Sequence, residues 1–267
     1  MVRLLFLILG LTAATLAARA DQVGHEIARK HAERGGGKYR DVRTLFIEGK
    51  TLIGGEIVDI RMWAERPNKL RVESQTGKRK VTQIYDGRHE PVITHSEVEN
   101  GRPLRMSAGE RKEFIANADF DGPLVDFAAK GYSVDYAGDE VVDGRPAKKL
   151  LVMNAQGDVF FLWIDAKSFE MVKRGVFRTA NDKRVLIETT FSDFRPVDGS
   201  LQPHRIETKA GARTLYLMVL TRMVANSPSS TGELFSVPEK WPLLPVEFKS
   251  DTSAAAPTTP PAAALHH

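Results

Sequence analysis

The sequence alternates between apolar and polar residues over most of its length, and this period of two constrains the fold more than any other feature. In the segment GEIVDIRMWAER, the alternation places Val58, Ile60, Met62 and Ala64 on one face of a strand. The pattern begins near Val42. Further strands are predicted at residues 69–75, 80–85, 133–142, 147–153, 159–165, 169–179, 183–195, 202–209 and 213–224.

The connections between these strands are short and rich in turn residues. Asp86-Gly87, Asp143-Gly144 and Asp198-Gly199 are typical of the tight turns of β-hairpins. Successive strands joined by hairpins predict an antiparallel meander, and a sheet this wide is expected to curl.

Helices are predicted at two places outside the strand pattern. One helix covers residues 22–34, where Val23, Ile27 and His31 follow helical spacing, and it stops at a run of three glycines. The other place is an insert near residues 107–131. There, Ser107 and Glu110 have the spacing of a capping box.

The insert is expected to contain two short helices. The first, at 108–118, places Phe114, Ile115 and Ala118 on one face. The second, at 123–130, begins with a proline, ends before Gly131 and has an apolar face of Leu124, Val125, Phe127 and Ala128. These faces need an apolar surface to cover, so we expect the helices to form a lid over the concave sheet.

The first 20 residues are typical of a secretory signal peptide. Arg3 precedes an apolar, charge-free run that ends in Ala18-Arg19-Ala20, so the mature chain is expected to begin at Asp21 and to be soluble and exported. We expect one domain over residues 21–248 and a disordered, Pro- and Ala-rich tail over 249–267. Loss of Arg3 and Arg19 lowers the formal net charge from +4 to +2, which does not favour nucleic-acid binding.

No motif in the sequence predicts catalysis. Cysteine is absent, which excludes disulfides, thiol catalysis and a lipidated N-terminal cysteine. His25 and Glu26 resemble the start of an HExxH zinc motif, but Arg29 occupies the position of the second histidine. We therefore predict no catalytic residue, no metal and no cofactor.

The sequence carries more apolar strand residues than one sheet needs. A set expected to face inward comprises Val58, Ile60, Met62, Leu70, Val72, Phe161 and Leu217. These residues form either a packed core or the wall of a ligand cavity, and the pattern alone leaves both open.

Three short segments resemble the LolA/LolB-like family of outer-membrane lipoprotein carriers. They are MWAERPN at 62–68, YDG at 85–87 and ELFSVPEKW at 233–241, in the order and at about the spacing of that family. The resemblance implies an unclosed antiparallel β-barrel with a lid of short α-helices and an apolar cavity for acyl chains. The segment RHEPVITH departs from the family pattern, because it lacks aromatic residues.

The resemblance also implies a role for Arg66. In the family, the arginine of the Arg-Pro-Asn corner bonds to backbone of the lid and holds it closed. The alternation of the preceding strand agrees with this role, because it places Arg66 on the same face as Met62 and Ala64. The alternative is a solvated arginine at a strand end.

Together these patterns predict a monomeric periplasmic carrier of lipid or lipoprotein acyl chains between membranes. It would receive cargo from an inner-membrane donor and pass it to an outer-membrane acceptor. The alternatives are a periplasmic sensor or interaction module of the same fold and, behind it, a hydrolase with an unrecognised site.

Overall fold

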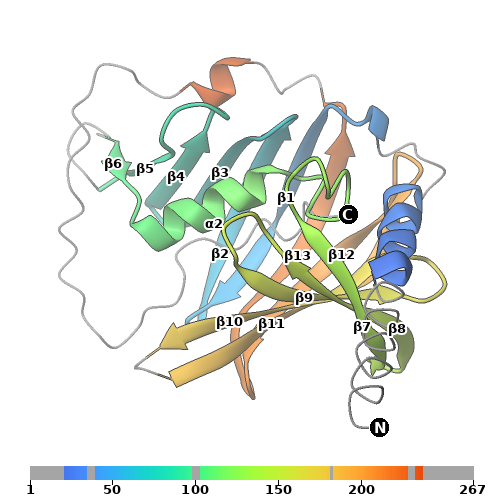
Figure 1. Cartoon of the computed structure of the whole chain (residues 1–267). Coiled ribbons are helices and arrows are strands. Elements are labelled where there is room, and N and C mark those ends of the chain that lie inside the picture. Colours follow the sequence, from blue (N-terminus) through green and yellow to red (C-terminus); the bar gives the residue numbers. More distant parts are fainter. Residues whose placement is uncertain (1–20, 35–39, 98–102, 181–182, 228–231, 237–267) are drawn as a thin grey trace, which may run out of the picture. The chain divides into compact units, whose positions relative to one another are not determined.

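The computed structural model describes residues 21–34, 40–97, 103–180, 183–227 and 232–236 of the 267-residue chain (Figure 1). The predicted signal peptide, the predicted tail and Trp241 lie outside these residues. No helix within the described ranges is both long enough and apolar enough to cross a bilayer.

The described residues form one 13-stranded sheet with the order β6-β5-β4-β3-β2-β1-β13-β12-β11-β10-β9-β8-β7. All strand pairs with a defined register are antiparallel. The first strands are β1 (Thr44–Ile53), β2 (Glu56–Glu65), β3 (Lys69–Thr76), β4 (Arg79–Tyr85), β5 (Val92–His95) and β6 (Leu104–Arg105). The others are β7 (Ser133–Val142), β8 (Arg145–Met153), β9 (Val159–Asp165), β10 (Met171–Ala180), β11 (Lys183–Val197), β12 (Ser200–Ala210) and β13 (Arg213–Ala225).

This order confirms the predicted fold class, a mainly β chain whose unclosed antiparallel sheet is accompanied by short helices. Two meanders, β1 to β6 and β7 to β13, are joined because β1 pairs with β13. The junction contains a bulge at Glu48/Gly49, where a Cβ on Gly49 would lie 2.4 Å from the carbonyl oxygen of Val219. Only glycine allows this approach without displacing the backbone. The short strands β5 and β6 were not predicted.

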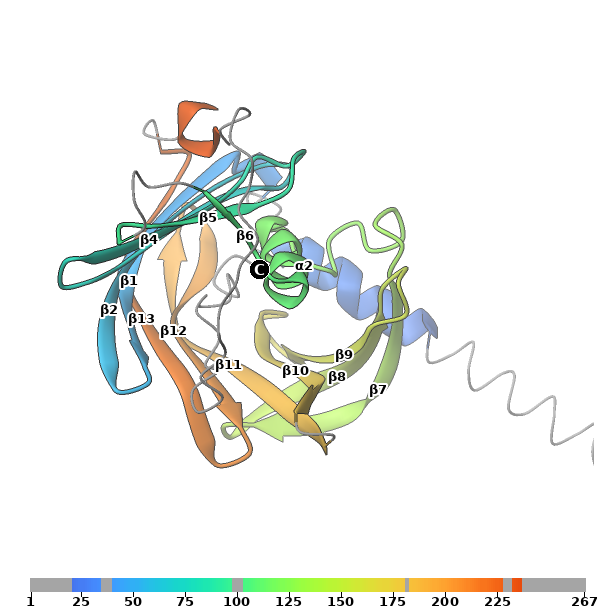
Figure 2. The ribbon, with the colours of Figure 1, turned by 90° about the vertical axis from the view of Figure 1, so that its left-hand side faces the viewer.

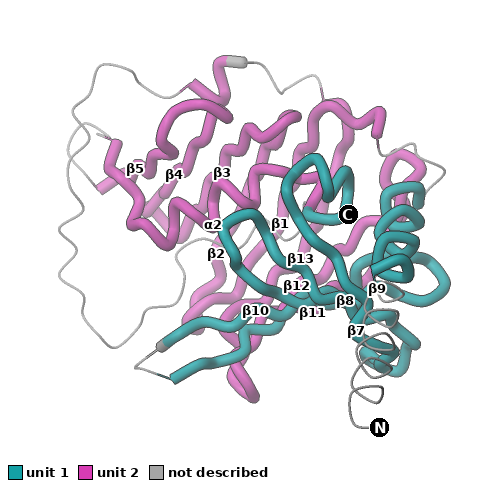
Figure 3. Tube along the Cα trace, in the orientation of Figure 1, with its two compact units in different colours: residues 1–34, 123–188 teal, residues 35–122, 189–267 magenta. Residues whose placement is uncertain are grey.

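The chain divides into two compact units, which we describe separately (Figure 3). Unit 1 comprises residues 1–34 and 123–188, with the helix at 21–32 and strands β7 to β10. Unit 2 comprises residues 35–122 and 189–267, with β1 to β6, β12, β13, helix α2 (Ala108–Ala118) and the 3₁₀ helix η3 (Gly232–Phe235). Strand β11 contributes to both units.

Helix α2 matches its predicted bounds and cap. The Ser107 hydroxyl accepts a bond from the Glu110 N–H (3.3 Å), and the Glu110 carboxylate accepts one from the Ser107 N–H (2.9 Å). Satisfying these otherwise unpaired amides fixes the start of the helix. The buried residues of α2 are Phe114, Asn117 and Ala118.

The prediction of a second helix at 123–130 was wrong. These residues form successive turns, with hydrogen bonds from the Lys130 N–H to the Asp126 carbonyl (3.1 Å) and from the Tyr132 N–H to the Phe127 carbonyl (2.9 Å). Asp126 has a φ of 52°, which interrupts a right-handed helix. The apolar spacing was compatible with a helix, but the backbone turns at this aspartate.

Candidate ligand-binding site

An apolar surface lies on one face of β2 and β3 in unit 2, and we call it the inner face. It is formed by Ile60, Met62, Ala64, Leu70 and Val72, all of which are buried. Met62 lies opposite Val72, and Ala64 opposite Leu70, so the two strands present their apolar side chains to the same side. The predicted parity of β2 is therefore confirmed by the burial of its alternate residues.

Helix α2 packs on the inner face. It contacts β3 and β4, and Figure 2 shows α2 and η3 on opposite faces of these strands. His95 lies opposite Val81 in the row that continues the inner face across β4. Burial lowers the pKa of His95, while the nearby carboxylates Glu97 and Glu110 oppose this shift. Since Glu110 is in the first turn of α2, the start of the helix lies near this edge of the face.

The opposite face of β3 is covered by η3. Arg71 donates a hydrogen bond to the Leu234 carbonyl (3.1 Å), and the Lys69 ammonium lies 5.8 Å from the centre of the Phe235 ring. Phe235 is buried. The part of the family-like segment at 233–241 that the structure describes thus belongs to a 3₁₀ helix, which packs on the side away from α2. Residues 237–241 of this segment lie outside the described residues.

Arg66, just beyond β2, joins that strand to the segment that follows α2. Its Nε donates to Asp121 Oδ2 (3.0 Å) and its Nη2 to Asp121 Oδ1, while Nη1 donates to the Arg40 carbonyl (2.6 Å). The guanidinium also lies 4.9 Å from the centre of the buried Phe120 ring. The paired side chains of Arg66 and Asp121 are only 16% and 19% exposed, so the two-pronged contact is partly protected from solvent.

The Arg-Pro-Asn corner also meets the Asp-Gly turn after β4. The Asn68 side-chain amide donates to the Gly87 carbonyl (3.5 Å). Gly87 has a φ of 85°, and a Cβ there would lie 2.4 Å from Asn68 Oδ1. Two of the three segments that resemble the carrier family are therefore neighbours in space.

The seven predicted cavity residues do not all share one surface. Ile60, Met62, Leu70 and Val72 lie on the inner face, and half-buried Val58 follows them along β2. Leu217 and Phe161 do not belong with this set. In β13 the buried residues are Tyr216, Met218 and Leu220, so Leu217 points to the other side.

Phe161 departs from the prediction for the same reason. In β9, Phe160, Leu162 and Ile164 are buried on one side of the strand. Half-buried Phe161 lies on the other side, together with buried Trp163. Phe161 also belongs to unit 1, whereas the inner face belongs to unit 2.

The predicted lid residues are also divided. Phe114 is buried against the sheet of unit 2. Ile115, which was expected on the same buried face, is 37% exposed, and Asn117 is buried instead. Buried Leu124 and Val125 and half-buried Phe127 belong to unit 1. There, the Phe127 ring centre lies 4.9 Å from that of His25.

Sequence reasoning missed a polar part of unit 2. Buried polar side chains follow β1 and β12, namely Thr51, Ser200, Gln202, His204 and Thr208. Within the described residues, Gln202 Oε1 and Thr51 Oγ1 are buried and have no hydrogen-bond partner. The alternation along β12 was visible in the sequence. The sequence did not indicate, however, that the polar residues of this strand would face the buried side.

Unit 1 contains a buried ion pair between Arg34, at the end of the first helix, and Glu170, beside β10. Arg34 Nε donates to Glu170 Oε2 (2.9 Å), and Arg34 Nη1 donates to the His31 carbonyl. Burial raises the pKa of Glu170 to about 7, although the Arg34 charge opposes this shift. His31 Nδ1 lies 2.7 Å from the Phe169 carbonyl oxygen, so the pair is part of the contact between this helix and the turn before β10.

A surface pocket of about 460 Å³ lies beside the same helix in unit 1. Its lining includes Val23, Ile27, Lys30, Lys148 and Phe169. Glu26, which also lines it, forms an ion pair with Arg29 (2.7 Å). Across the described ranges, no group of three or more His, Cys, Asp or Glu side chains has a metal-binding arrangement.

No family model matches this chain, and no curated protein matches it. Several solved structures, however, are similar to this chain. A putative outer membrane lipoprotein-sorting protein domain from Vibrio parahaemolyticus has a TM-score of 0.56 at 11% identity, covering 80% of this chain and 97% of the other. A LolA superfamily protein from Nitrosomonas europaea has a TM-score of 0.53 at 14% identity, with the same coverage of 80% and 97%.

A third similar structure, a DUF1329 family protein from Desulfovibrio piger, has a TM-score of 0.55 at 12% identity and covers 79% of this chain and 95% of the other. Identities this low establish a common fold and leave ligand and function open. The protein has a LolA-like fold.

Proposed function

We propose that this protein is a periplasmic carrier that holds lipid, or the acyl chains of lipoproteins, against the inner face and moves them between membranes. The observation that supports this proposal most directly is that, among the described residues of unit 2, the one α-helix, α2, packs on an apolar sheet face. One helix is easier to displace than a second sheet, so an acyl chain could take its place without loss of the strands. The signal-like first 20 residues favour export.

Arg66 would control this exchange. Its bonds to Asp121 and to the Arg40 carbonyl hold the segment after α2 against the end of β2. Cargo that lifts α2 from the inner face would have to break these bonds. The closed, empty state would therefore be favoured, which promotes delivery of cargo over its retention.

The names of two structural neighbours also support a carrier. One is called an outer membrane lipoprotein-sorting protein domain and another a LolA superfamily protein. We propose the same broad role here, with a donor at the inner membrane and an acceptor at the outer membrane. The buried polar groups of β1 and β12 would then be available to the polar end of a ligand.

Native mass spectrometry of protein purified without detergent tests the proposal. A carrier is expected to show adducts with the masses of phospholipid or lipoprotein acyl groups, and Met62→Asp should abolish them. The matched control Arg61→Asp alters the exposed neighbour on the same strand and should retain them. Adduct-free protein that instead forms a stable complex with another exported protein would contradict the carrier role and favour a sensor.

A further inference from the structure

The side of the unit 2 sheet that carries the inner face continues from β2 as far as β12. Thr51 of β1 lies opposite Val58 of β2, so it shares the side of Ile60. Thr51 also lies opposite Met218 of β13, which in turn lies opposite Ile206 of β12. Because directly opposed residues share a side of the sheet, Ile206 points to the same side as the inner face.

Polar residues occupy this side of β12. They lie two or four residues from Ile206, so their side chains point the same way. All four are buried, and we call them the polar row: Ser200, Gln202, His204 and Thr208. The Thr208 hydroxyl is hydrogen-bonded to that of buried Thr189 in β11 (2.7 Å). The sheet side that is apolar at β2 is therefore polar at β12.

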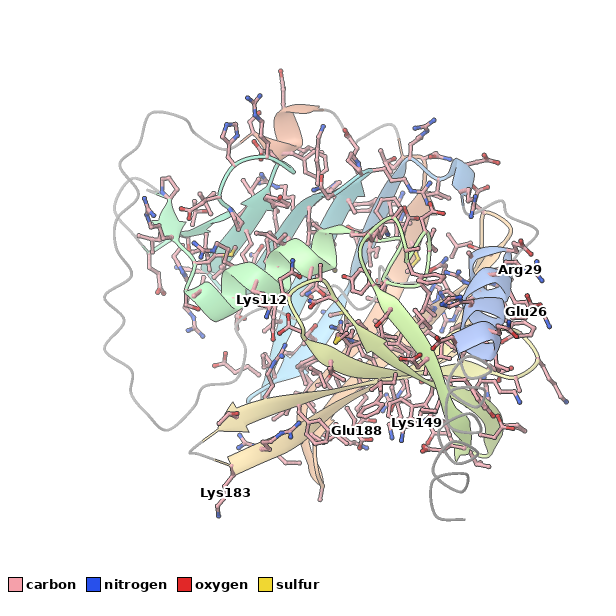
Figure 4. The ribbon with its side chains drawn as sticks, viewed as in Figure 1. Glu26, Arg29, Lys112, Lys149, Lys183 and Glu188 are labelled. Atoms are coloured by element: carbon pink, nitrogen blue, oxygen red, sulfur yellow. The ribbon has the colours of Figure 1, made fainter. Side chains whose placement is uncertain are left out.

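The polar row contains no carboxylate, lysine or arginine, whereas the alternate positions of β12 are charged. Arg205, Glu207 and Lys209 point to the other side of the strand, where Glu207 pairs with both cations (3.7 and 3.3 Å). Glu188, the neighbour of Thr189 in β11, likewise points away from the polar row and pairs with a lysine of β10 (Figure 4).

Asp193 of β11 is a charged group close enough to His204 for their charges to interact. Its carboxylate is 42% exposed and accepts two hydrogen bonds from Arg195 (3.1 and 2.6 Å). The pair adds no net charge beside the polar row, and its carboxylate would repel an anion. These surroundings favour a polar group without charge.

The hydrogen bonds of Gln202 fix the orientation of its side-chain amide. Ser200 Oγ donates to the Val197 carbonyl (3.1 Å), so it can only accept from Gln202. The amide group of Gln202 therefore turns Nε2 toward Ser200 (2.9 Å) and Oε1 away from it. Gln202 Oε1 is buried and has no hydrogen-bond partner among the residues that the structure describes.

A second atom on the same side of the sheet has the same property. Thr51 Oγ1 is also buried and without a hydrogen-bond partner within the described ranges. Thr51 lies between the inner face and the polar row, opposite Val58. Leaving a buried polar atom unpaired is costly, so a ligand that supplies hydrogen bonds at these positions gains affinity from them.

We propose that the polar row binds the head of the cargo lipid, and that this head is uncharged and carries a hydrogen-bond donor, either a hydroxyl or an amide N–H. Gln202 Oε1 can only accept, so the donor must come from the ligand. The acyl chain would lie on the inner face, on the same side of the sheet. This inference rests on the proposed carrier function and adds the chemical class of its ligand.

Competition binding to the full exported chain tests this proposal. Methyl oleate, N-methyloleamide and monooleoylglycerol each displace a fluorescent fatty acid, and their affinities are compared. Methyl oleate has no donor, N-methyloleamide replaces one of its oxygens with N–H, and monooleoylglycerol supplies hydroxyls. Gln202→Met keeps the length of the side chain and removes the acceptor. It should lower the affinity of the amide, the hydroxyl compound or both about tenfold relative to methyl oleate.

The competitor that loses affinity identifies the donor. A loss for the amide alone points to the N-acyl group of a lipoprotein, and a loss for monooleoylglycerol alone points to the hydroxyl of a free lipid. The matched control Gln75→Met makes the same change at an exposed glutamine of β3 and should retain the relative affinities of the wild type.

Two further measurements guard against a folding defect. Gln202→Met should be at least as resistant to urea as the wild type, because it removes a buried acceptor that has no partner. Ser200→Ala removes the hydroxyl that orients the Gln202 amide, so it should reduce the same relative affinity by a smaller factor.

Relative affinities that are equal in the wild type and Gln202→Met would overturn the proposal, while binding of methyl oleate would leave the carrier function standing. A larger loss for oleate or oleylamine than for the uncharged competitors would also overturn it, because the polar row would then select a charged head. If neither the fluorescent fatty acid nor any competitor binds, the carrier function itself is wrong, and this inference with it.

Discussion

Arg66 illustrates how one side chain can connect distant segments. A guanidinium cannot lose its charge, so a partly buried one needs matching acceptors. Here they come from Asp121, 55 residues further along the chain, and from the Arg40 backbone. The planar fork fits a carboxylate with two bonds, which a lysine cannot reproduce.

We expect Arg66→Leu to bind an apolar ligand and release it about tenfold more slowly than the wild type. The substitution removes charge-assisted hydrogen bonds worth roughly 1.5–3 kcal/mol from the closed, empty state, and that state drives release. Arg66→Lys should be intermediate. Stopped-flow displacement of a fluorescent lipid measures the rates, with Arg61→Leu on the exposed side of β2 as the control. Equal rates in all four proteins would identify Arg66 as a structural strand-end residue.

Glu170 provides a second prediction at this scale. Its pKa is about 7 in the folded protein, above its ordinary value of 4.5, because burial disfavours the charged form. The folded chain therefore binds more protons than the unfolded chain between these two pH values. It follows that the contribution of Glu170 to stability is full below pH 4.5 and decreases as the pH rises towards 7.

Replacement of Glu170 by Gln removes this dependence. The difference in unfolding free energy between wild type and Glu170→Gln should change by on the order of 3 kcal/mol between pH 4.5 and pH 7. Urea denaturation at several pH values measures it. Glu33→Gln, an exposed carboxylate near the end of the same helix, should leave the pH profile of the wild type unaltered. Parallel profiles for wild type and Glu170→Gln would show that the carboxyl group does not titrate in this range.

Among the elements, α2 is held differently from the strands around it. Strands β2 and β3 share a continuous ladder with their neighbours, whereas α2 is attached through a buried face of Phe114, Asn117 and Ala118 and through the segment that Arg66 contacts. Its own capping box keeps it helical when it moves as a unit. An element with few buried contacts opens more easily than a ladder.

We expect the amides of α2 to exchange with solvent through a local opening of lower free energy than that of β2 and β3. Hydrogen-exchange mass spectrometry can compare peptides from residues 108–118 with those from 60–72. Arg66→Leu should reduce protection in α2 and leave the strands unchanged. If α2 exchanges only when the strands do, it belongs to the folding core and cannot serve as a lid.

At the scale of the whole molecule, the expected maturation of the chain remains a prediction. Residues 1–20 lie outside the described residues, and the described chain begins at Asp21 in a helix. We expect export to remove the first 20 residues, because Ala18-Arg19-Ala20 has the small residues that signal cleavage requires. Intact-mass measurement of the exported protein should give a chain that starts at Asp21. A mass that includes Met1, or recovery with the membrane fraction, would contradict this prediction.

Much of the strand layout could be predicted from the sequence. Strand β9 has its predicted bounds, and the buried residues of β2 are those that the alternation placed together. Both features depend on local rules, since successive side chains of a strand point to opposite sides and tight turns need particular residues. The capping box of α2 was equally local, because its two partners are three residues apart.

Other features depended on residues that are distant in the sequence. Phe161 and Leu217 lie within apolar runs, where period two cannot distinguish one face from the other, and neighbouring strands decided which face was buried. The pairing of β1 with β13, and the choice of Asp121 as the partner of Arg66, have no local signal at all. The sequence by itself thus determined where strands and turns form, through short-range sterics and hydrogen bonding. Only the tertiary structure decided which faces are covered and which charges meet, because those outcomes depend on packing between distant segments.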